Sequence, residues 1–348
     1  MSHIDINFFI SLDKIQSKWH ELFSLQSRTS FCSLSWHQVM LKLLASTFLT
    51  RKIYKLSYFE ANKKGTNGTQ EAVGYYYIKT INKKQTLVFG PVVGPSDYFD
   101  FVCNGAVDAS FLHEIILKIA VHTQVTAISF NHIQKNTVLF DACNMFNNLS
   151  FNTLKCVSIA PKLSYQEHIQ SLSKNAKQNL RTAHNRLLKS ELPYEIAFLT
   201  PDNKDQIDFK ALKKLYKQRN AHKKQHITLK SKLYKAVDHL FQPAADMFDL
   251  EEIKKTDFLL GILKIEGTIA AYFFGLQNQS TIEINRVTIN NKFKFYSPGM
   301  ILIDAFIKKS FELDIKTIDL TIGDEKYKYD LGGQTHEIIS ATATLCLN

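Results

Sequence analysis

The sequence predicts a mixed α/β (α+β) fold in two domains, and three observations support this. The chain has 348 residues, enough for two domains that each bury a core. Apolar runs with helical and strand periodicity alternate along it. A loose repeat of helices, strand meander, helix and strand occupies residues 19–157, and a similar order follows it. We expect domains over residues 1–160 and 161–348, the second led by a basic helix over residues 164–189.

The composition is that of a globular protein with a basic surface. Hydrophobic residues make up 45% of the chain and charged residues 22%, which argues against disorder. Forty-three Lys and Arg outnumber 32 Asp and Glu, for a formal net charge of +11. This charge attracts polyanions and anionic membrane surfaces at long range. The lysines are dispersed, so a well-solvated basic surface is an equally good interpretation.

The five cysteines and the N-terminus indicate where the protein acts. The cysteines are odd in number, scattered and without a CxxC pair, which indicates a reduced, intracellular protein. The N-terminal apolar run contains Asp5 and is too short for a signal peptide. No uncharged apolar stretch reaches the ~18 residues that span a bilayer. We expect a cytoplasmic protein, with peripheral membrane contact left open.

Both halves carry their elements in a similar order. In the N-terminal half, helices are expected over residues 19–25, 35–47, 111–122 and 140–146, and strands over 52–59, 72–80, 86–89, 125–130 and 149–157. In the C-terminal half, helices are expected over residues 164–189, 209–221, 229–241 and 300–313, and strands over 194–199, 258–265, 268–276, 281–289, 318–322 and 338–347. The N-terminal half shows no constellation of residues that suggests catalysis.

The helix over residues 164–189 is amphipathic and basic. Its apolar residues recur at helical spacing: Leu172, Ala176, Leu180, Ala183 and Leu187. This spacing leaves basic residues exposed or at the edge of the apolar face: Lys174, Lys177, Arg181 and Arg186.

The strand over residues 281–289 changes its alternation midway. Ile282 and Ile284 set one parity, whereas Val287 and Ile289 have the opposite one. One extra residue near Asn285-Arg286 explains the change and predicts a β-bulge. A bulge separates neighbouring strands and leaves backbone N–H groups where a ligand can lie.

Ser297-Pro298-Gly299 stands immediately before the helical run that begins at Met300. Ser297 is a good N-cap residue, and Pro298 at the first helical position loses no hydrogen bond. Gly299 has no Cβ, so another backbone or a ligand can approach closely. The unpaired N–H groups of the first turn and the helix dipole suit a phosphate, which favours a cofactor of nucleotide type.

Three pieces of this region resemble the CelD-like acetyltransferase family, part of the GNAT superfamily of acyl-coenzyme A transferases. The segments 296–299 (YSPG) and 323–328 (GDEKYK), with Asp319 between them, resemble its ySPG…D…GDe.YK pattern. Residues 173–181 resemble its basic segment, although the family often has Arg where Lys177 stands. Six residues in the N-terminal half of this chain also resemble the N-terminal half of that family: Trp19, Phe31, Trp36, Gly94, Asp97 and Tyr98. The resemblance therefore covers most of the chain.

The resemblance implies tandem GNAT-like domains, because the family is related to FemAB-type transferases. Each domain is expected to hold a mixed, mostly antiparallel sheet flanked by helices, with the N-terminal domain degenerate. The bulged strand is expected to part from the next one, and the pyrophosphate of an acyl-coenzyme A to rest on the helix start between them. The Gln/Arg-x-x-Gly-x-Gly/Ala loop more usual in the superfamily is absent, so fewer glycines contact the phosphates.

Acyl transfer from a thioester needs donors for the carbonyl oxygen, a proton acceptor and an acid for the departing thiolate. The candidate donors are the backbone N–H groups of Arg286 and Val287. Tyr327 is the expected acid, with a structural, half-buried tyrosine as the alternative. Asp319 and Asp324 are candidates to accept the proton or hold the acceptor, or else are turn and cap residues.

The remaining candidates bind the two substrates. The helix start completes the coenzyme site with Ser297, Pro298, Gly299 and Met300. The candidates for substrate binding are Lys177, Arg181, Glu283 and Lys328. Glu283 is otherwise a cross-strand partner, and Lys328 a phosphate ligand or a solvated lysine.

The resemblance implies an acyl-coenzyme A-dependent N-acyltransferase, with acetyl as the expected acyl group. Transfer would be direct, to an amine of a small molecule or of a sugar or polysaccharide precursor. Two alternatives stay open. One is a FemAB-like aminoacyltransferase that uses aminoacyl-tRNA and a cell-wall precursor. The other is a non-catalytic binding protein on a transferase fold.

Neither a metal nor DNA is expected as a partner. His222 and His226 stand four apart, but no Glu lies between them as in HExxH and no third ligand suggests itself. The basic helix lacks interleaved aromatic residues and a recognition motif.

Overall fold

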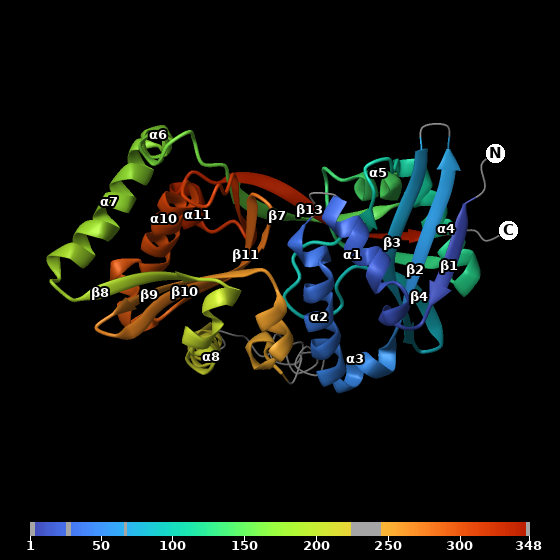
Figure 1. The fold of residues 1–348 in the computed structure, drawn as a ribbon, viewed down its shortest axis with the longest axis horizontal. Coiled ribbons are helices and arrows are strands. Elements are labelled where there is room, and N and C mark those ends of the chain that lie inside the picture. The colour runs from blue at the N-terminus through green and yellow to red at the C-terminus, as the bar shows by residue number, and fades with distance from the viewer. Residues whose placement is uncertain (1–3, 26–28, 66–67, 224–244, 346–348) are drawn as a thin grey trace. The chain divides into compact units, whose positions relative to one another are not determined.

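The computed structural model describes residues 4–25, 29–65, 68–223 and 245–345. These residues form two compact units (Figure 1). Of the described residues, the first unit holds 4–154 and 337–345, and the second holds 155–223 and 245–336. The two units change over between residues 154 and 155, whereas the domains were expected to meet at residues 160 and 161. Residues 337–345 belong to the first unit, which the order of elements did not indicate.

The first unit is a mixed sheet with helices on both faces. Its strands lie in the order β1-β2-β3-β4-β6-β13, and β4 and β6 are parallel neighbours. The helices are α1 (Gln16–Leu25), α2 (Leu34–Ser46), α3 (Phe48–Ile53), α4 (Ala109–Thr123) and α5 (Val138–Asn144). The strands are β1 (Asp5–Phe9), β2 (Tyr54–Gly65), β3 (Gly68–Ile81), β4 (Lys84–Phe89), β5 (Val102–Cys103), β6 (Ala127–Gln134), the start of β7 (Ser150–Ile159) and most of β13 (Gln334–Thr344).

Helix α4 provides most of the apolar surface on one side of this sheet. Ile115, Ile116 and Ile119 are fully buried in a cluster with the aromatic side chains of Phe89 and Phe130. Asp108 caps the helix, since its carboxylate accepts the Phe111 N–H at 2.8 Å. A separate cluster holds α1, through the buried side chains Trp19 and Leu22.

The second unit repeats this order of elements. Its sheet runs β7-β12-β11-β10-β9-β8, and β11 and β12 are its parallel neighbours. The helices are α6 (Tyr165–Ser171), α7 (Lys174–Lys189), α8 (Phe209–Lys223), α10 (Pro298–Ser310) and α11 (Lys326–Asp330). The strands are β8 (Tyr194–Leu199), β9 (Phe258–Ile265), β10 (Thr268–Asn278), β11 (Thr281–Ile289) and β12 (Thr317–Ile322).

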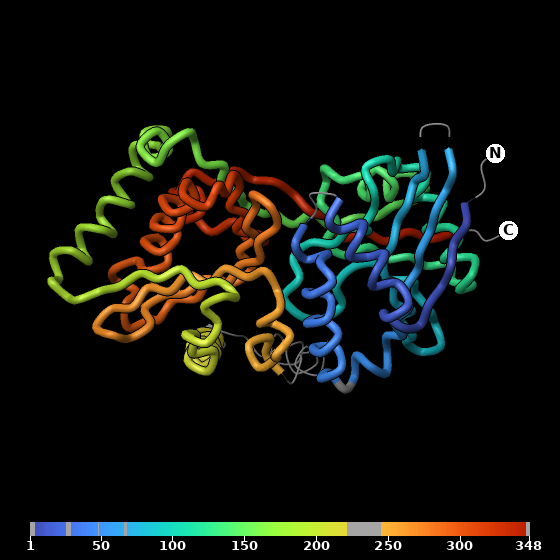
Figure 2. Tube along the Cα trace, in the orientation of Figure 1, coloured from blue at the N-terminus to red at the C-terminus, as the bar shows by residue number. Residues whose placement is uncertain are grey.

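The predicted tandem architecture is confirmed by this repeat. In each half an antiparallel meander is followed by a helix, a parallel neighbour of its last strand, a short helix and a final strand. The final strands are exchanged: Cys156–Ile159 of β7 pair with β12, and Ile338–Thr344 of β13 pair with β6. Figure 2 shows the red end of the chain among the blue and green strands of the first unit.

One expected helix differs from the prediction, and another is not described by the structure. The single helix over residues 164–189 is wrong, because the chain breaks at Leu172 and Ser173 into α6 and α7. Ser173 begins α7 as an N-cap whose hydroxyl accepts the Ala176 N–H at 3.2 Å. The helix expected over residues 229–241 lies outside the described residues.

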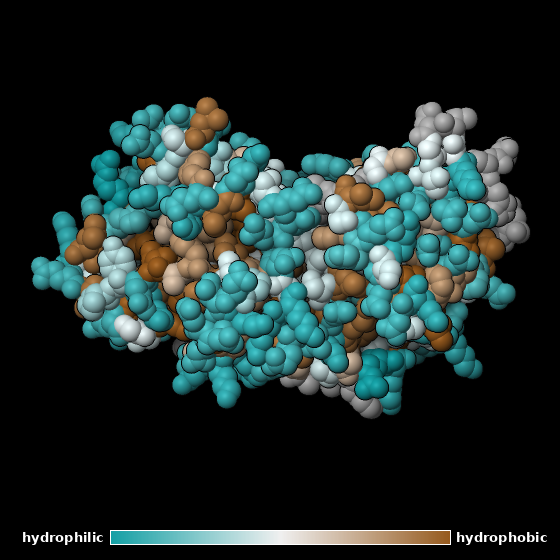
Figure 3. Space-filling model, viewed as in Figure 1, coloured by the Kyte–Doolittle hydropathy of each residue, from teal (hydrophilic) through white to brown (hydrophobic). Residues whose placement is uncertain are grey.

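The cores take up most apolar side chains of both units. On the face drawn in Figure 3, hydrophilic side chains predominate, and apolar ones gather in a patch on the left half of the view. Among the described residues, no helix has both the length and the apolar character needed to cross a membrane.

The buried His37 predicts acid sensitivity of the first unit. Its ring stacks on Trp19 and lies tilted against Tyr75, and Nε2 lies 3.2 Å from the Tyr58 hydroxyl. Burial lowers the pKa of His37 from 6.5 to about 3. Between these values the unfolded chain binds a proton that the folded chain does not, so stability is retained above pH ~6.5 and falls below it. From pH 7 to 5, we expect a loss of about 2 kcal/mol in the free energy of unfolding.

Urea unfolding followed by tryptophan fluorescence measures this loss, because both tryptophans, Trp19 and Trp36, lie in the first unit. His37→Phe should reduce the pH dependence by about 2 kcal/mol over the same interval. His20→Gln, on the exposed side of α1, is the matched control and should behave like the unsubstituted protein. Equal pH dependence in all three proteins would contradict the assignment.

Candidate active site

The candidate site forms where β11 and β12 part. The β10–β11 register pairs Phe274 with Arg286 and Gly275 with Ile284, so Asn285 is the extra residue of a bulge. This confirms the predicted bulge. The parallel ladder between β11 and β12 covers only residues 281–283 and 317–319, although β11 continues to Ile289. Beyond this ladder, the Thr321 hydroxyl donates to the Ile284 carbonyl at 3.1 Å.

The helix start after β11 differs from the prediction at its first residue. Ser297 occupies the N-cap position, but its backbone is left-handed (φ 53°, ψ 51°) and its side chain makes no capping hydrogen bond. The expected side-chain cap is therefore wrong, because this conformation does not present the hydroxyl to the first turn. The Ser297 carbonyl instead accepts the N–H groups of Met300 at 3.0 Å and Ile301 at 3.2 Å. Pro298 is the first helical residue, as predicted.

Gly299 allows α10 to approach β11 closely. A Cβ at this position would lie 3.1 Å from Ile289 Cγ2 and 3.8 Å from Val287 Cγ1. Both side chains belong to β11 beyond the bulge. The Ser-Pro-Gly run therefore places the helix start directly against the parted strand.

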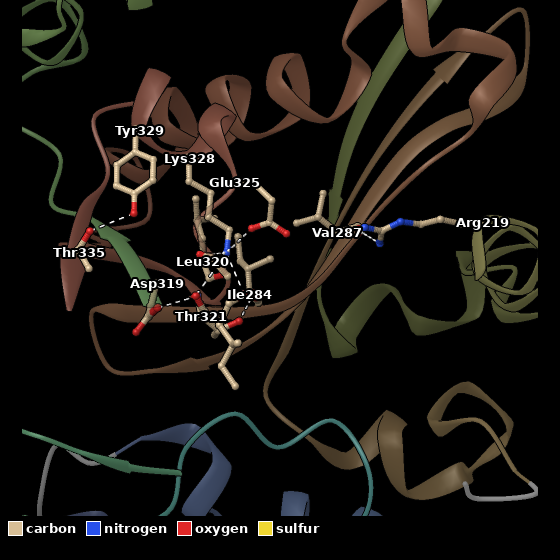
Figure 4. A network of polar contacts seen from close by, with 12 residues as sticks. Arg219, Ile284, Val287, Asp319, Leu320, Thr321, Glu325, Lys328, Tyr329 and Thr335 are labelled. Atoms are coloured by element: carbon tan, nitrogen blue, oxygen red, sulfur yellow. Dashed lines mark hydrogen bonds and ion pairs between the residues drawn. The ribbon is translucent and has the colours of Figure 1, made fainter. Parts of the chain in front are cut away.

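Lys328 holds the end of β12 on the other side of the gap. Its side chain is buried, and Nζ donates to four consecutive carbonyls, those of Leu320, Thr321, Ile322 and Gly323, at 2.8 to 3.3 Å (Figure 4). The Glu325 carboxylate lies 3.1 Å away. An ammonium group bound by these carbonyls has no N–H to offer a phosphate. The expected substrate contact of Lys328 is therefore replaced by a structural one.

The Tyr327 hydroxyl is buried within range of the charges of Glu325 and Arg219. Burial raises the pKa of its hydroxyl, the Glu325 charge raises it further, and the Arg219 charge lowers it. The net shift is upward, so the phenol keeps its proton at neutral pH. Arg219, on α8, donates to the Val287 carbonyl on the parted part of β11, and Figure 4 shows Glu325 on the opposite side of Val287.

Three titratable side chains meet at the last rung of the ladder. Glu283 and Asp319 are register partners, and both are buried. One Asp319 oxygen accepts the Thr321 N–H at 2.8 Å, and the other lies 3.5 Å from Nε2 of His336. Burial lowers the pKa of His336, and the Lys328 charge lowers it further, so its imidazole is neutral at pH 7.

Arg286 supports the bulge from the face that α8 covers. Its guanidinium lies 3.1 Å from the Asp246 carboxylate and 3.8 Å from the centre of the Tyr216 ring. This side chain therefore joins α8 and the Asp246 turn to β11. The backbone N–H groups of Arg286 and Val287 remain the predicted donors to the acyl oxygen.

Three other predicted residues are outside the contacts described so far, although Asp324 follows the end of β12 by two residues. Asp324 is exposed and lies 3.7 Å from Lys155. Lys177 donates to the Gln170 carbonyl at 2.8 Å, which joins α6 to α7, and Arg181 is exposed on α7. Asp324 and Lys177 thus contact groups other than Tyr327 and Asp319.

Sequence reasoning missed two residues of the site, Arg219 and His336. Arg219 is one of several basic residues on α8, and His336 follows the family-like motif without belonging to it. No spacing in the sequence distinguishes either one. Among the described residues, no group of three or more His, Cys, Asp or Glu side chains is arranged to hold a metal ion. His226 and the side chain of His222 lie outside the described part of the chain.

Comparison with known proteins gives one family and several solved structures. Residues 174–329 match the family model described as an acetyltransferase (GNAT) domain. The curated protein sequences contain no match.

Three solved structures resemble the chain over nearly its whole length. A conserved protein of unknown function from Bacteroides thetaiotaomicron is 14% identical, with a TM-score of 0.57 and coverage of 98% of this chain and 100% of that one. FemX is 10% identical, with a TM-score of 0.57 and 97% coverage of both chains. The C-terminal domain of a putative lysylphosphatidylglycerol synthetase from Agrobacterium fabrum is 9% identical, with a TM-score of 0.55 and coverage of 95% and 92%. At these identities the likeness concerns the fold alone.

The four carbonyl contacts of Lys328 predict a structural effect of its substitution. Lys328→Met should lower the free energy of unfolding by about 2–3 kcal/mol, because buried carbonyls lose a charged donor. Calorimetry of the second unit's transition measures this loss. Lys326→Met is the control, since Lys326 is exposed and its ion pair with Asp330 is worth at most about 1 kcal/mol. Unchanged stability of Lys328→Met would contradict the structural role.

Proposed function

The chain carries a GNAT-type acyltransferase domain, and on that premise we propose that it transfers an acyl group, acetyl in the simplest case, from acyl-coenzyme A to an amine. The acceptor is a small molecule or a sugar or polysaccharide precursor. The parting of β11 and β12 is the observation that carries the proposal. Residues around this gap are available both to bind the acyl donor and to transfer the two protons.

The parted part of β11 suits the pantetheine arm of the donor. Its backbone has left the ladder with β12 after Glu283, and a pantetheine amide has the N–H and C=O groups that a neighbouring strand would have offered. The helix start at Pro298 follows directly, with its dipole toward a diphosphate. Of the first-turn N–H groups, that of Ile301 belongs to the regular helix and that of Met300 already contacts Ser297. We therefore assign the diphosphate to the Gly299 N–H and the dipole.

The residues at the two ends of the gap fit the two proton transfers. The acceptor nitrogen attacks the thioester carbonyl carbon, a C–N bond forms and the C–S bond breaks. We assign the amine proton to the neutral imidazole of His336, which Asp319 orients, and we assign protonation of the departing thiolate to Tyr327. No covalent enzyme intermediate is required.

A FemAB-like aminoacyltransferase is the second candidate. The fold shared with FemX over 97% of both chains and the basic helix α7 favour it. In that case an aminoacyl-tRNA replaces acyl-coenzyme A, and the acyl group is an amino acid.

Equilibrium binding separates the two donors. We expect the protein to bind radiolabelled acetyl-coenzyme A saturably and to bind aminoacyl-tRNA weakly, with strong salt dependence. Tyr327→Phe should leave acetyl-coenzyme A binding unchanged and reduce turnover by about 10²–10⁴-fold, because only the proton donor is lost. Thiol release with a panel of amino sugars and nucleotide sugars measures turnover. Tight binding of aminoacyl-tRNA alone would favour the FemAB-like reaction, and full turnover by Tyr327→Phe would remove its assigned role.

The His336–Asp319 pair predicts a pH effect on turnover. Because the pKa of His336 lies below its usual value, the base stays neutral under mildly acidic conditions and activity should fall only at lower pH. His336→Gln should lower kcat by about 10²–10⁴-fold and remove this acid limb, with an unchanged KM for acetyl-coenzyme A. The exposed His20→Gln serves as control. If His336→Gln kept the acid limb, the proton acceptor would be another group, such as Glu283.

A further inference from the structure

An exposed aromatic ring stands directly before the helix start. Phe295 belongs to the short 3-10 helix η7 (Asn291–Tyr296), and 64% of its surface is exposed, whereas the neighbouring Phe293 is buried. Two residues separate it from Pro298 at the start of α10. Covering an exposed phenylalanine ring removes apolar surface from water, which favours binding of a ligand there.

The Phe295 ring is held in place from two sides. The guanidinium carbon of Arg186, on α7, lies 4.7 Å from the ring centre, and Arg186 also donates to the Phe295 carbonyl at 3.2 Å. The Tyr296 ring meets it edge-on, with ring centres 5.4 Å apart. The guanidinium and the ring therefore form a fixed, flat and partly exposed platform.

The surroundings of this platform are mainly cationic. Lys292 and Lys294 flank Phe295 on η7, and both are exposed along with Arg186. Glu266 lies 3.7 Å from Lys292 and offsets part of that charge. A flat aromatic face beside several cations suits a nucleobase that carries phosphate groups.

We propose that Phe295 and Arg186 form the subsite for the 3′-phosphoadenosine end of acyl-coenzyme A. The base stacks on the Phe295–Arg186 platform, and Arg186 and Lys294 neutralise the phosphates. The proposal rests on the proposed function, because the coenzyme's diphosphate joins this end to the arm that we assign to the gap between β11 and β12. Continuity along the chain supports it: Phe295, Ser297 and Gly299 follow one another into the assigned diphosphate site.

Calorimetric titration with coenzyme A, 3′-dephospho-coenzyme A and pantetheine tests the subsite without knowledge of the acceptor. Phe295→Ala should weaken coenzyme A binding by about tenfold through lost stacking and leave pantetheine binding unchanged. Arg186→Gln should weaken coenzyme A more than 3′-dephospho-coenzyme A, because only the former carries the 3′-phosphate. Phe151→Ala, at an exposed phenylalanine of the first unit, and Lys189→Gln, at an exposed cation of α7, are the matched controls and should bind all three ligands as the unsubstituted protein does.

The outcomes separate this proposal from the proposed function. If the unsubstituted protein binds coenzyme A and both Phe295→Ala and Arg186→Gln bind it equally well, the subsite is wrong while the donor assignment stands. The subsite is also wrong if the unsubstituted protein binds pantetheine as tightly as coenzyme A. If the unsubstituted protein binds none of the three ligands, the proposed function fails and the subsite fails with it.

Discussion

The candidate site depends on one constraint: buried backbone groups must find partners even where two strands part. An extra residue at Asn285 shifts the side-chain parity of β11, and the ladder with β12 ends at Glu283 and Asp319. The groups beyond that rung no longer pair between these strands. In this structure, two cationic side chains and one hydroxyl group donate hydrogen bonds to several of these backbone carbonyls.

Each of these side chains comes from a different element. Lys328 donates to the carbonyls at the end of β12, and Arg219 donates to the Val287 carbonyl on β11. The Thr321 hydroxyl on β12 donates to the Ile284 carbonyl on β11, just beyond the last rung of the ladder. The strands are also attached to separate neighbours, since Gly299 brings α10 against β11 while Lys328 joins α11 to β12. Packing and charge on each strand therefore support the two sides of the gap independently.

The parts of this arrangement that are local in sequence were predictable. The change of parity between Ile284 and Val287 located the bulge, and Pro298 located the helix start. The break of the basic helix at Ser173 was also visible in principle, because a serine just before a run with helical periodicity is an N-cap signal.

Contacts between distant segments left no such signal. Nothing in the residues around Lys328 indicates that its ammonium group turns back onto four carbonyls instead of toward solvent. The exchange of β7 and β13 was hidden for the same reason, since periodicity predicts a strand and not its partner.

The first unit shows what the same topology looks like without the gap. Its parallel pair β4 and β6 also shares three rungs, but these involve the last three residues of β4, which ends at Phe89. Gly90 follows with φ +100°, and a Cβ there would lie 2.3 Å from the Asn131 carbonyl oxygen, so the chain stays against β6 where β11 moves away from β12. The next helix, α4, is capped by the Asp108 side chain, which accepts an N–H of the first turn. In α10 the Ser297 side chain accepts no such hydrogen bond. The first half of the chain thus has the same topology without a parted strand pair, and residues 156–159 of β7 complete the sheet beside β12.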